Sequence, residues 1–152
     1  MMSSLLQNGL IKKALATDSS WGSLVLRVPI GIIFAAHGAQ KLFGWFGGHG
    51  LEGTAGWMES IGLAPGMLMA FLAGAGEFFG GVLIILGLLT RPAALVLAFT
   101  MVVAIFAVHF EHGLFLANNG YEFGLALLAA SAALFFYGGG KFSVDGMLSG
   151  TK

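Results

Sequence analysis

Four long apolar stretches dominate the chain, and shorter segments rich in glycine and polar residues separate them. A helix needs about 20 mostly apolar residues to cross the hydrocarbon core of a bilayer, which is ~30 Å thick. Each stretch is near that length, and the fourth is the shortest. The pattern therefore predicts four membrane-spanning helices, over residues 22–43, 64–89, 92–110 and 121–138.

The connections between these helices differ in length. Residues 90–92, Thr-Arg-Pro, leave room only for a tight turn, so we expect the second and third helices to form an antiparallel hairpin. The connection over residues 44–62 is longer, rich in glycine, and carries two tryptophans. It predicts a short helix at the membrane interface, because apolar residues recur in it at helical spacing: Leu51, Ala55, Met58 and Ile61.

Residues 1–20 precede the first predicted span. Lys12 and Lys13 follow the apolar residues of this segment instead of preceding them, which argues against a signal peptide. The segment is either an irregular tail or an amphipathic helix at the interface, whose apolar positions are Leu5, Leu6, Leu10, Ile11 and Leu15. We thus expect an all-α fold: an integral membrane four-helix bundle over residues 21–148, with a short interfacial helix in the first outer loop.

Composition agrees with this picture. Hydrophobic residues make up 57% of the chain, charged residues only 9%, and the mean hydropathy is +0.90. Soluble domains carry about 25% charged residues, so the expected partner of the surface is the lipid bilayer. The net charge is zero and basic residues are few, which argues against nucleic acid. The chain has no cysteine, which excludes thiol redox chemistry and thiolate metal ligands within it.

Basic residues suggest an orientation. The side with both termini carries Lys12, Lys13, Arg91, Lys141 and Lys152, whereas Lys41 alone lies on the other side. The positive-inside rule then predicts a multi-pass membrane protein with both termini in the cytoplasm.

Two charged residues lie inside the apolar stretches. Arg27 is in the first and Glu77 near the middle of the second. A charge at bilayer depth costs about 2.5–3.5 kcal/mol on insertion scales, so we expect these two to face each other or a wet cavity. Such a pair could equally serve only to fix two helices. Gly76 and Gly80 allow close helix approach, which we attribute to packing inside the bundle rather than to a dimer, although an oligomer stays open.

A second group of polar residues gathers near the ends of the spans that lie on the side away from both termini. We expect it to ring one cavity, and a quinone or quinone-like aromatic is the favoured ligand. A haem between His37 and His109 is a weaker alternative, as is a metal site at His109, Glu111, His112 and Glu122, which lacks the i, i+4 histidine pair of helical zinc motifs. Each residue could also simply cap a helix end. The ligand-binding candidates are Arg27, His37, Gln40, Lys41, Glu77, His109 and Glu122.

Several segments resemble the DoxX-type membrane proteins. Residues 26–31 (LRVPIG) and 37–42 (HGAQKL) resemble the first span of that family, and 77–81 (EFFGG) with 86–91 (LGLLTR) resemble the second. Residues 118–122 (NNGYE) and 140–145 (GKFSVD) resemble the fourth span and the tail. The resemblance covers about residues 22–148, and the matching motif positions include Arg27, His37, Lys41, Glu77, Glu122, Ser143 and Asp145. For Ser143 and Asp145 we expect a structural role in a turn rather than catalysis.

The resemblance implies a four-helix bundle in the inner (plasma) membrane of a bacterium or archaeon, linked to quinone-dependent redox chemistry or to defence against redox stress and aromatic compounds. The leading hypothesis is thus a membrane component of a redox system that binds a quinone, with no covalently bound cofactor. Its electrons would come from a soluble or membrane oxidoreductase partner, as in a quinone-linked oxidoreductase subunit, and no catalytic residue or metal is assigned. A small-solute transporter or permeation bundle, and a non-catalytic scaffold for a soluble oxidoreductase, are the alternatives.

Overall fold

The computed structural model describes residues 9–17 and 20–150, and over these residues it contains helices and no strand. The longer helices are α3 (Trp21–Phe43), α4 (Gly50–Ser60), α5 (Gly66–Leu86), α6 (Thr90–Ala104) and α7 (Glu122–Tyr137). Short helices α2 (Gly9–Ala14) and α8 (Val144–Ser149) flank them. Single turns complete the list: η1 (Trp45–Gly47), η2 (Ile105–His109), η3 (Phe110–His112) and η4 (Leu116–Asn118).

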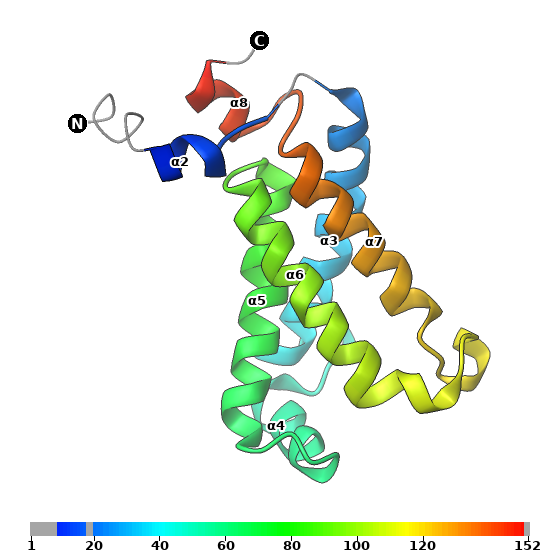
Figure 1. Ribbon diagram of the computed structural model, residues 1–152. Helices are drawn as coiled ribbons and strands as arrows, with labels where there is room; N and C mark the ends of the chain where they lie inside the picture. Colours follow the sequence, from blue (N-terminus) through cyan, green and yellow to red (C-terminus); the bar gives the residue numbers. More distant parts are fainter. Residues whose placement is uncertain (1–8, 18–19, 151–152) are drawn as a thin grey trace.

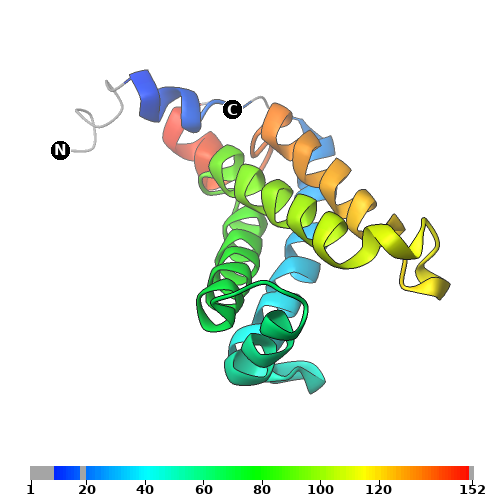
Figure 2. The same cartoon turned by 60° about the horizontal axis from the view of Figure 1, so that its bottom comes forward.

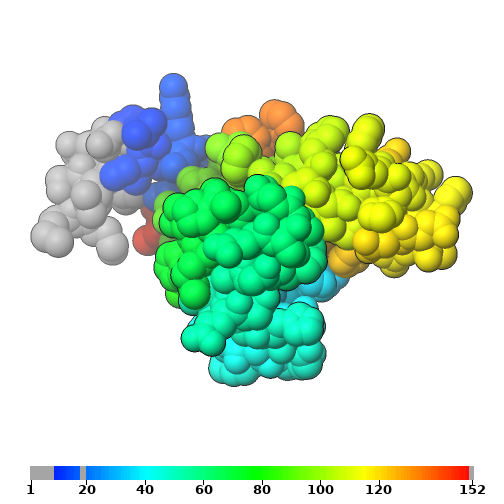
Figure 3. Space-filling view, turned by 90° about the horizontal axis from the view of Figure 1, so that it is seen from below, coloured from blue at the N-terminus to red at the C-terminus, as the bar shows by residue number. Residues whose placement is uncertain are grey.

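Two helix pairs build the bundle. Helix α3 lies along α5, and α6 lies along α7. The pairs are close together at the end that carries α2 and α8, and they diverge toward the end that carries α4 (Figures 1 and 2). We call these the α2/α8 end and the α4 end. Seen from the α4 end, α4 and the start of α5 lie beside the end of α6 and the loop that follows it, which extends to one side (Figure 3).

The surface of the helices is suited to lipid. Three of them, Trp21–Phe43, Gly66–Leu86 and Thr90–His112, are long and apolar enough to cross a membrane, while α7 is a shorter apolar helix. Large apolar side chains that are more than half exposed are spread over these helices, including Val25, Ile32, Phe71, Phe79, Leu95, Phe99, Phe106 and Phe136. Exposed apolar surface on this scale marks contact with a membrane, so the predicted all-α membrane bundle is confirmed.

Glycines allow a close backbone contact between α3 and α5. A Cβ atom on Gly38 would lie 2.6 Å from Phe78 Cα and 2.7 Å from the Gly74 carbonyl oxygen. A Cβ on Gly81 would lie 2.5 Å from the Ala35 nitrogen. Lipid tails are as apolar as leucine, so helices associate in a bilayer through close packing rather than through the hydrophobic effect. The backbone contact therefore holds α3 against α5.

Gly76 and Gly80 lie on a different face of α5. Added Cβ atoms at these positions would meet Val96 and Thr100 or the Leu97 side chain, all of which belong to α6. The prediction that this small-residue step packs inside the bundle is confirmed. Helix α5 thus packs α3 and α6 through different sets of small residues.

The ends of α5 follow from local chemistry. Pro65 is its N-cap, and Glu59 at the end of α4 accepts a hydrogen bond from the Gly66 nitrogen (3.2 Å). Gly87 ends the helix in the left-handed conformation at φ 66°, which glycine adopts without a steric cost. The helix is therefore shorter at both ends than the predicted span over residues 64–89.

The N-terminal segment contains one short helix. Of the apolar residues that suggested an amphipathic helix, Leu5 and Leu6 lie outside the described residues. Leu10 in α2 is exposed, whereas Leu15 just after it is buried. Arg91 holds the segment on the bundle, because its Nε donates to the Ala16 carbonyl oxygen (2.7 Å) and its Nη1 to that of Phe135 (2.8 Å).

Candidate ligand-binding cleft

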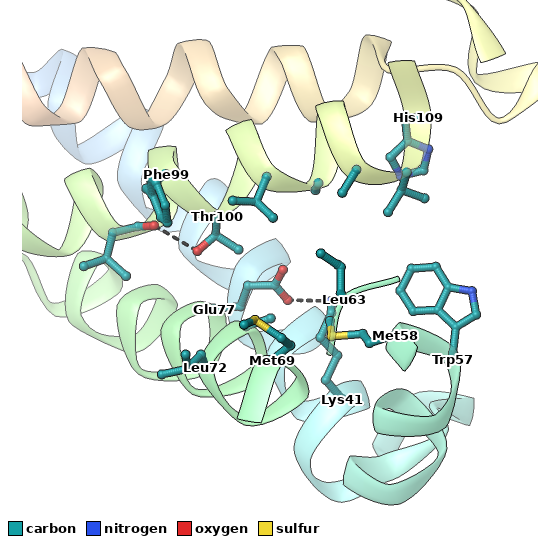
Figure 4. Close-up of a pocket in the computed structure, with 16 residues that line it drawn as sticks. Lys41, Trp57, Met58, Leu63, Met69, Leu72, Glu77, Phe99, Thr100 and His109 are labelled. Atoms are coloured by element: carbon teal, nitrogen blue, oxygen red, sulfur yellow. Dashed lines mark hydrogen bonds and ion pairs between the residues drawn. The ribbon is translucent and has the colours of Figure 1, made fainter. Parts of the chain in front are cut away.

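A cleft of about 420 Å³ lies between α5 and α6, on the side where the two helix pairs diverge. Helix α4 and the segment after it contribute Trp57, Met58 and Leu63, and α3 contributes only Lys41. Most of the lining is apolar (Figure 4). Its charged or hydrogen-bonding side chains are Lys41, Trp57, Glu77, Thr100 and His109.

Lys41 and Glu77 form an ion pair in the wall of this cleft. Lys41 Nζ donates to Glu77 Oε2 over 2.7 Å (Figure 4). The Glu77 side chain is 5% exposed and that of Lys41 is 24% exposed. The glutamate is therefore buried at bilayer depth with the cation it requires, while part of the lysine reaches the open space.

The close contact of α3 with α5 creates this pair. Lys41 lies one turn after Gly38 on α3, and Gly74 lies one turn before Glu77 on α5. A Cβ on Gly74 would lie 3.2 Å from Lys41 Cβ, so the glycine leaves the space that the lysine stem occupies. The same small residues that join the helices also bring the two charges together.

Arg27 lies elsewhere, and the predicted pairing of Arg27 with Glu77 is wrong. The arginine is 1% exposed at the α2/α8 end of the bundle. Its Nη1 donates to the carbonyl oxygens of Ile84 (3.4 Å) and Ile85 in the last turn of α5. The Ile84 carbonyl oxygen also accepts from the Gly87 nitrogen (3.2 Å), so the guanidinium adds a second hydrogen bond there, supplies one to Ile85, and places a favourable charge at the helix C-terminus.

The rest of the guanidinium binds the segment that follows α7. Nε donates to the Gly139 carbonyl oxygen (2.8 Å), and Nη2 donates to those of Lys141 (2.9 Å) and Phe142 (2.8 Å). Five fixed N–H donors suit such a cluster of backbone acceptors better than one carboxylate does. Arg27 therefore joins α5 to the C-terminal segment and takes no part in the cleft.

Asp145 and Ser143 complete this junction. Asp145 is 1% exposed, and its carboxylate accepts hydrogen bonds from the Leu89 nitrogen (2.8 Å) and the Thr90 nitrogen (2.9 Å) at the start of α6. Ser143 Oγ accepts from the Gly146 nitrogen (3.0 Å) and caps α8. The predicted structural role of these two residues is confirmed.

Three other candidates lie outside the cleft. His37 Nδ1 is 2.9 Å from the Ile33 carbonyl oxygen, and its ring faces Phe123 with centroids 6.1 Å apart. Gln40 Nε2 donates to the Phe46 carbonyl oxygen (3.3 Å). Glu122 Oε1 accepts from the Leu116 nitrogen (2.8 Å). These residues tie local backbone together, so the predicted ring of the second polar group around one cavity is wrong for His37, Gln40 and Glu122.

His109 does reach the cleft. It lies in η2, a π-helical turn that continues α6, and its Nδ1 is 2.9 Å from the Asn119 carbonyl oxygen. A carbonyl oxygen can only accept, so Nδ1 carries the proton and Nε2 is an acceptor in the neutral ring. Trp57 and His109 lie on opposite sides of the cleft at the α4 end (Figure 4). The structure does not bring His37 to this histidine, as a haem between the two would require.

A second, polar hollow of about 460 Å³ adjoins the first and shares Trp57, Ala107 and Val108 with it. Its polar lining includes Glu111, His112 and Asn119. Within residues 9–17 and 20–150, no three His, Asp or Glu side chains are grouped so that they could hold a metal ion. We call this hollow the vestibule, since it lies at the α4 end of the cleft.

Reasoning from the sequence missed most of the cleft lining. Met58 was assigned only to the apolar face of an interfacial helix, and Met69 and Thr100 were not singled out. Nothing in their spacing distinguishes them from other apolar positions of the same helices. Only the divergence of α6 from α5 makes them walls of a cleft.

Apolar helices of membrane length and their lipid-suited surface define a multi-pass helical membrane protein. The DoxX family model matches residues 22–110, and the chain belongs to this family. It is 38% identical over 113 residues to a Bacillus subtilis protein named "Putative oxidoreductase CatD", covering 74% of this chain and 78% of that one. It is 34% identical over 134 residues to the Escherichia coli "Inner membrane protein YqjF", covering 84% and 92%. No solved structure matches the chain.

Proposed function

We propose that this DoxX-family protein is the membrane component of a redox system and binds a quinone or a quinone-like aromatic in the α5–α6 cleft. The observation that carries the proposal is the Lys41–Glu77 ion pair in the wall of an otherwise apolar cleft of about 420 Å³. Ligand pockets typically measure about 300–1,000 Å³ and combine apolar walls with a few polar groups that fix orientation.

The polar groups of the cleft match those of a quinone and its reduced form. The Lys41 ammonium has three donors, and Glu77 engages one of them. A quinone carbonyl oxygen can accept from another, while a quinol hydroxyl can donate to the Glu77 carboxylate or to His109 Nε2. Apolar side chains, among them Met58, Leu63 and Met69, are available to pack the ring.

The redox role rests on the ligand class and on one relative. The printed name of CatD describes an oxidoreductase, and CatD is 38% identical to this chain. The chain has no cysteine for thiol redox chemistry. We therefore propose that a soluble or membrane oxidoreductase partner supplies the electrons. By the positive-inside rule, we also propose that both termini of this chain are in the cytoplasm.

The cleft is closed toward the α2/α8 end, which supports ligand binding over permeation. Between the cleft and the α2/α8 end lies an apolar core that includes Phe34, Ile84 and Leu97, each at most 1% exposed. Residues in such a core are close-packed, with few voids larger than a water molecule. A solute that entered at the α4 end would meet this core before it reached the other side.

Tryptophan fluorescence in lipid nanodiscs tests the proposal. Trp57 lines the cleft, whereas Trp21 starts α3 at the α2/α8 end and Trp45 lies in η1. In the variant Trp21→Phe/Trp45→Phe, duroquinone should quench the remaining Trp57 in a saturable manner. Quenching that rises linearly with the quinone concentration, without saturation, would contradict the proposal.

A matched pair of variants separates the site from general membrane partitioning. In the Trp57-only background, Glu77→Gln should weaken the binding of duroquinol by about ten-fold or more, because the quinol hydroxyl donates to the carboxylate and a hydrogen bond to a charged group contributes about 1.5–3 kcal/mol. Glu52→Gln, on the exposed face of α4, should leave the affinity unchanged. Solute flux from liposomes that disappears in Glu77→Gln, without quinone binding, would support the permeation bundle instead.

A further inference from the structure

One wall of the cleft consists of apolar side chains that are themselves exposed. Leu72 of α5 and Val96 and Phe99 of α6 line it, yet their side chains are 54%, 49% and 68% exposed. All three lie on helices that are long and apolar enough to cross a membrane. Their exposed surface is therefore available to lipid beside the cleft. We call these three residues the lateral opening.

Resting on the proposed function, we infer that the ligand of this cleft carries a prenyl or alkyl tail, which leaves through the lateral opening into the lipid. The substrate class is then a membrane-dissolved quinone or similar tailed aromatic that enters sideways from the bilayer, rather than a water-soluble aromatic that enters from the α4 end.

The depth of the opening supports lateral entry. At a rise of ~1.5 Å per residue, Leu72 lies about 9 Å along the helix axis from Gly66, where α5 starts. Phe99 lies about 14 Å along the helix axis from Thr90, where α6 starts. Both positions are several ångströms inside a hydrocarbon core that is about 30 Å thick. An opening at this depth meets acyl chains and not water.

The α4 end of the cleft has the opposite character. It leads to the vestibule, where Glu111, His112 and Asn119 offer charged and polar groups. An alkyl tail there would take these groups out of water without giving them a hydrogen bond, which costs free energy. The polarity of the two exits therefore orients an amphipathic ligand with its ring at Lys41–Glu77 and its tail toward the lateral opening.

The packing of α5 on α6 explains why the opening exists. Around Gly76 the helices are close, since an added Cβ would lie 3.4 Å from Val96 Cγ1. Leu72 is one turn nearer the α4 end, where the helices have begun to diverge (Figure 1). The cleft itself is near the lower limit of ligand pockets, so a long tail has to continue outside it.

A series of benzoquinones with increasing tail length tests the inference, measured by quenching of Trp57 in the Trp57-only background. Each dissociation constant is expressed as the quinone concentration within the nanodisc membrane. Differences in how the quinones partition between water and lipid then cancel. Duroquinone, a decyl-tailed quinone and a longer prenyl quinone should bind the parent protein with similar affinity, because the extra chain stays in lipid. A steep loss of affinity with tail length would show an enclosed pocket and overturn the inference.

Variants that narrow the lateral opening provide a second test of the inference. Val96→Leu and Leu72→Phe each enlarge one side of the opening and add no fluorophore, so each should weaken the tailed quinones by about ten-fold and leave duroquinone unchanged. Phe79→Leu, an exposed α5 position away from the cleft, is the control and should change neither. Equal losses for tailed and tail-less ligands would overturn lateral exit, whereas no saturable binding of any quinone to the parent protein would overturn the proposed function itself.

Discussion

Lys41 and Glu77, which are 36 residues apart in the chain, meet over 2.7 Å where α3 crosses the middle of α5. The glutamate is almost completely buried, and the lysine is its hydrogen-bonded cation. The pair both stabilises an otherwise costly charge and places polar chemistry in an apolar cleft.

A double-mutant cycle should show that the two charges depend on each other. Lys41→Met leaves a buried carboxylate without its cation, and Glu77→Leu leaves the ammonium without its anion. Each single change should lower the free energy of unfolding by about 1–3 kcal/mol. The double variant should be less destabilised than the sum, because both charges are gone. Unfolding in mixed micelles, followed by circular dichroism, measures the cycle, and losses that simply add would refute the coupling.

The two histidines named from the sequence should differ in ligand binding. His109 lines the cleft, whereas His37 packs against Phe123 outside it. His109→Phe should therefore weaken the binding of duroquinol several-fold, because phenylalanine cannot accept from a quinol hydroxyl, and His37→Phe should leave the dissociation constant unchanged. Titrations of the Trp57-only protein provide the measurement. A stronger effect at His37 would show that the ligand lies between α3 and α7.

Arg27 should control the order of the C-terminal segment. Arg27→Lys keeps the charge but cannot reach the carbonyl oxygens of Gly139, Lys141 and Phe142 together. We expect a loss of about 1–3 kcal/mol in unfolding free energy, from buried carbonyls left without donors. Hydrogen exchange should become faster in residues 138–146. The same substitution at Arg91, which is partly exposed, is the comparison and should have a smaller effect.

Asp145 should stabilise the start of α6, although the two are far apart in the chain. Asp145→Ala removes the acceptor for the Leu89 and Thr90 nitrogens, and loss of a helix cap costs about 0.5–2 kcal/mol. Asp145→Asn keeps one acceptor oxygen and should lose less. Thermal unfolding in detergent gives the ranking. Equal midpoints for Asp145→Ala and the parent protein would contradict the capping role.

Gly38 should not tolerate a methyl group. Its added Cβ would lie 2.6 Å from the Phe78 backbone, so Gly38→Ala has to separate α3 from α5. We expect one of the largest losses of stability for a single methyl, about 1–3 kcal/mol or more, together with a weaker Lys41–Glu77 contact. Gly56→Ala in α4 is the matched control. Nothing lies within 4 Å of its Cβ, and alanine favours the helix, so this variant should be neutral or slightly stabilised.

The apolar pattern was sufficient to predict the helices. Hydrophobic length identified α3, α5, α6 and α7, and helical spacing with flanking tryptophans identified α4. These features depend on neighbours within one segment, which the sequence records directly. The ends of α5 moved because Pro65 and Gly87 cap it. Helix α6 begins at Thr90, so residues 90–92 form its first turn and not the predicted connection, and a π-helical turn replaces its predicted end.

The candidate site could be predicted only in part. The sequence correctly singled out Lys41, Glu77 and His109 as cleft residues, but it paired Glu77 with Arg27 and added His37, Gln40 and Glu122. Arg27 found its partners among backbone carbonyls, and every residue has one of these, so no side-chain pattern could reveal them. The position of a residue along a helix also does not show how the helix is rotated about its axis, and therefore toward which neighbour the side chain points.

The sequence by itself therefore determined an all-helical membrane protein and the presence of buried charges, because hydrophobicity and charge are properties of single segments in lipid. Only the tertiary structure decided which charges meet and where the cleft lies. Glycine contacts set the register of α3 on α5, and the divergence of α6 opened the cleft. Both depend on packing between segments far apart in the chain, where a single methyl group changes which side chains can touch.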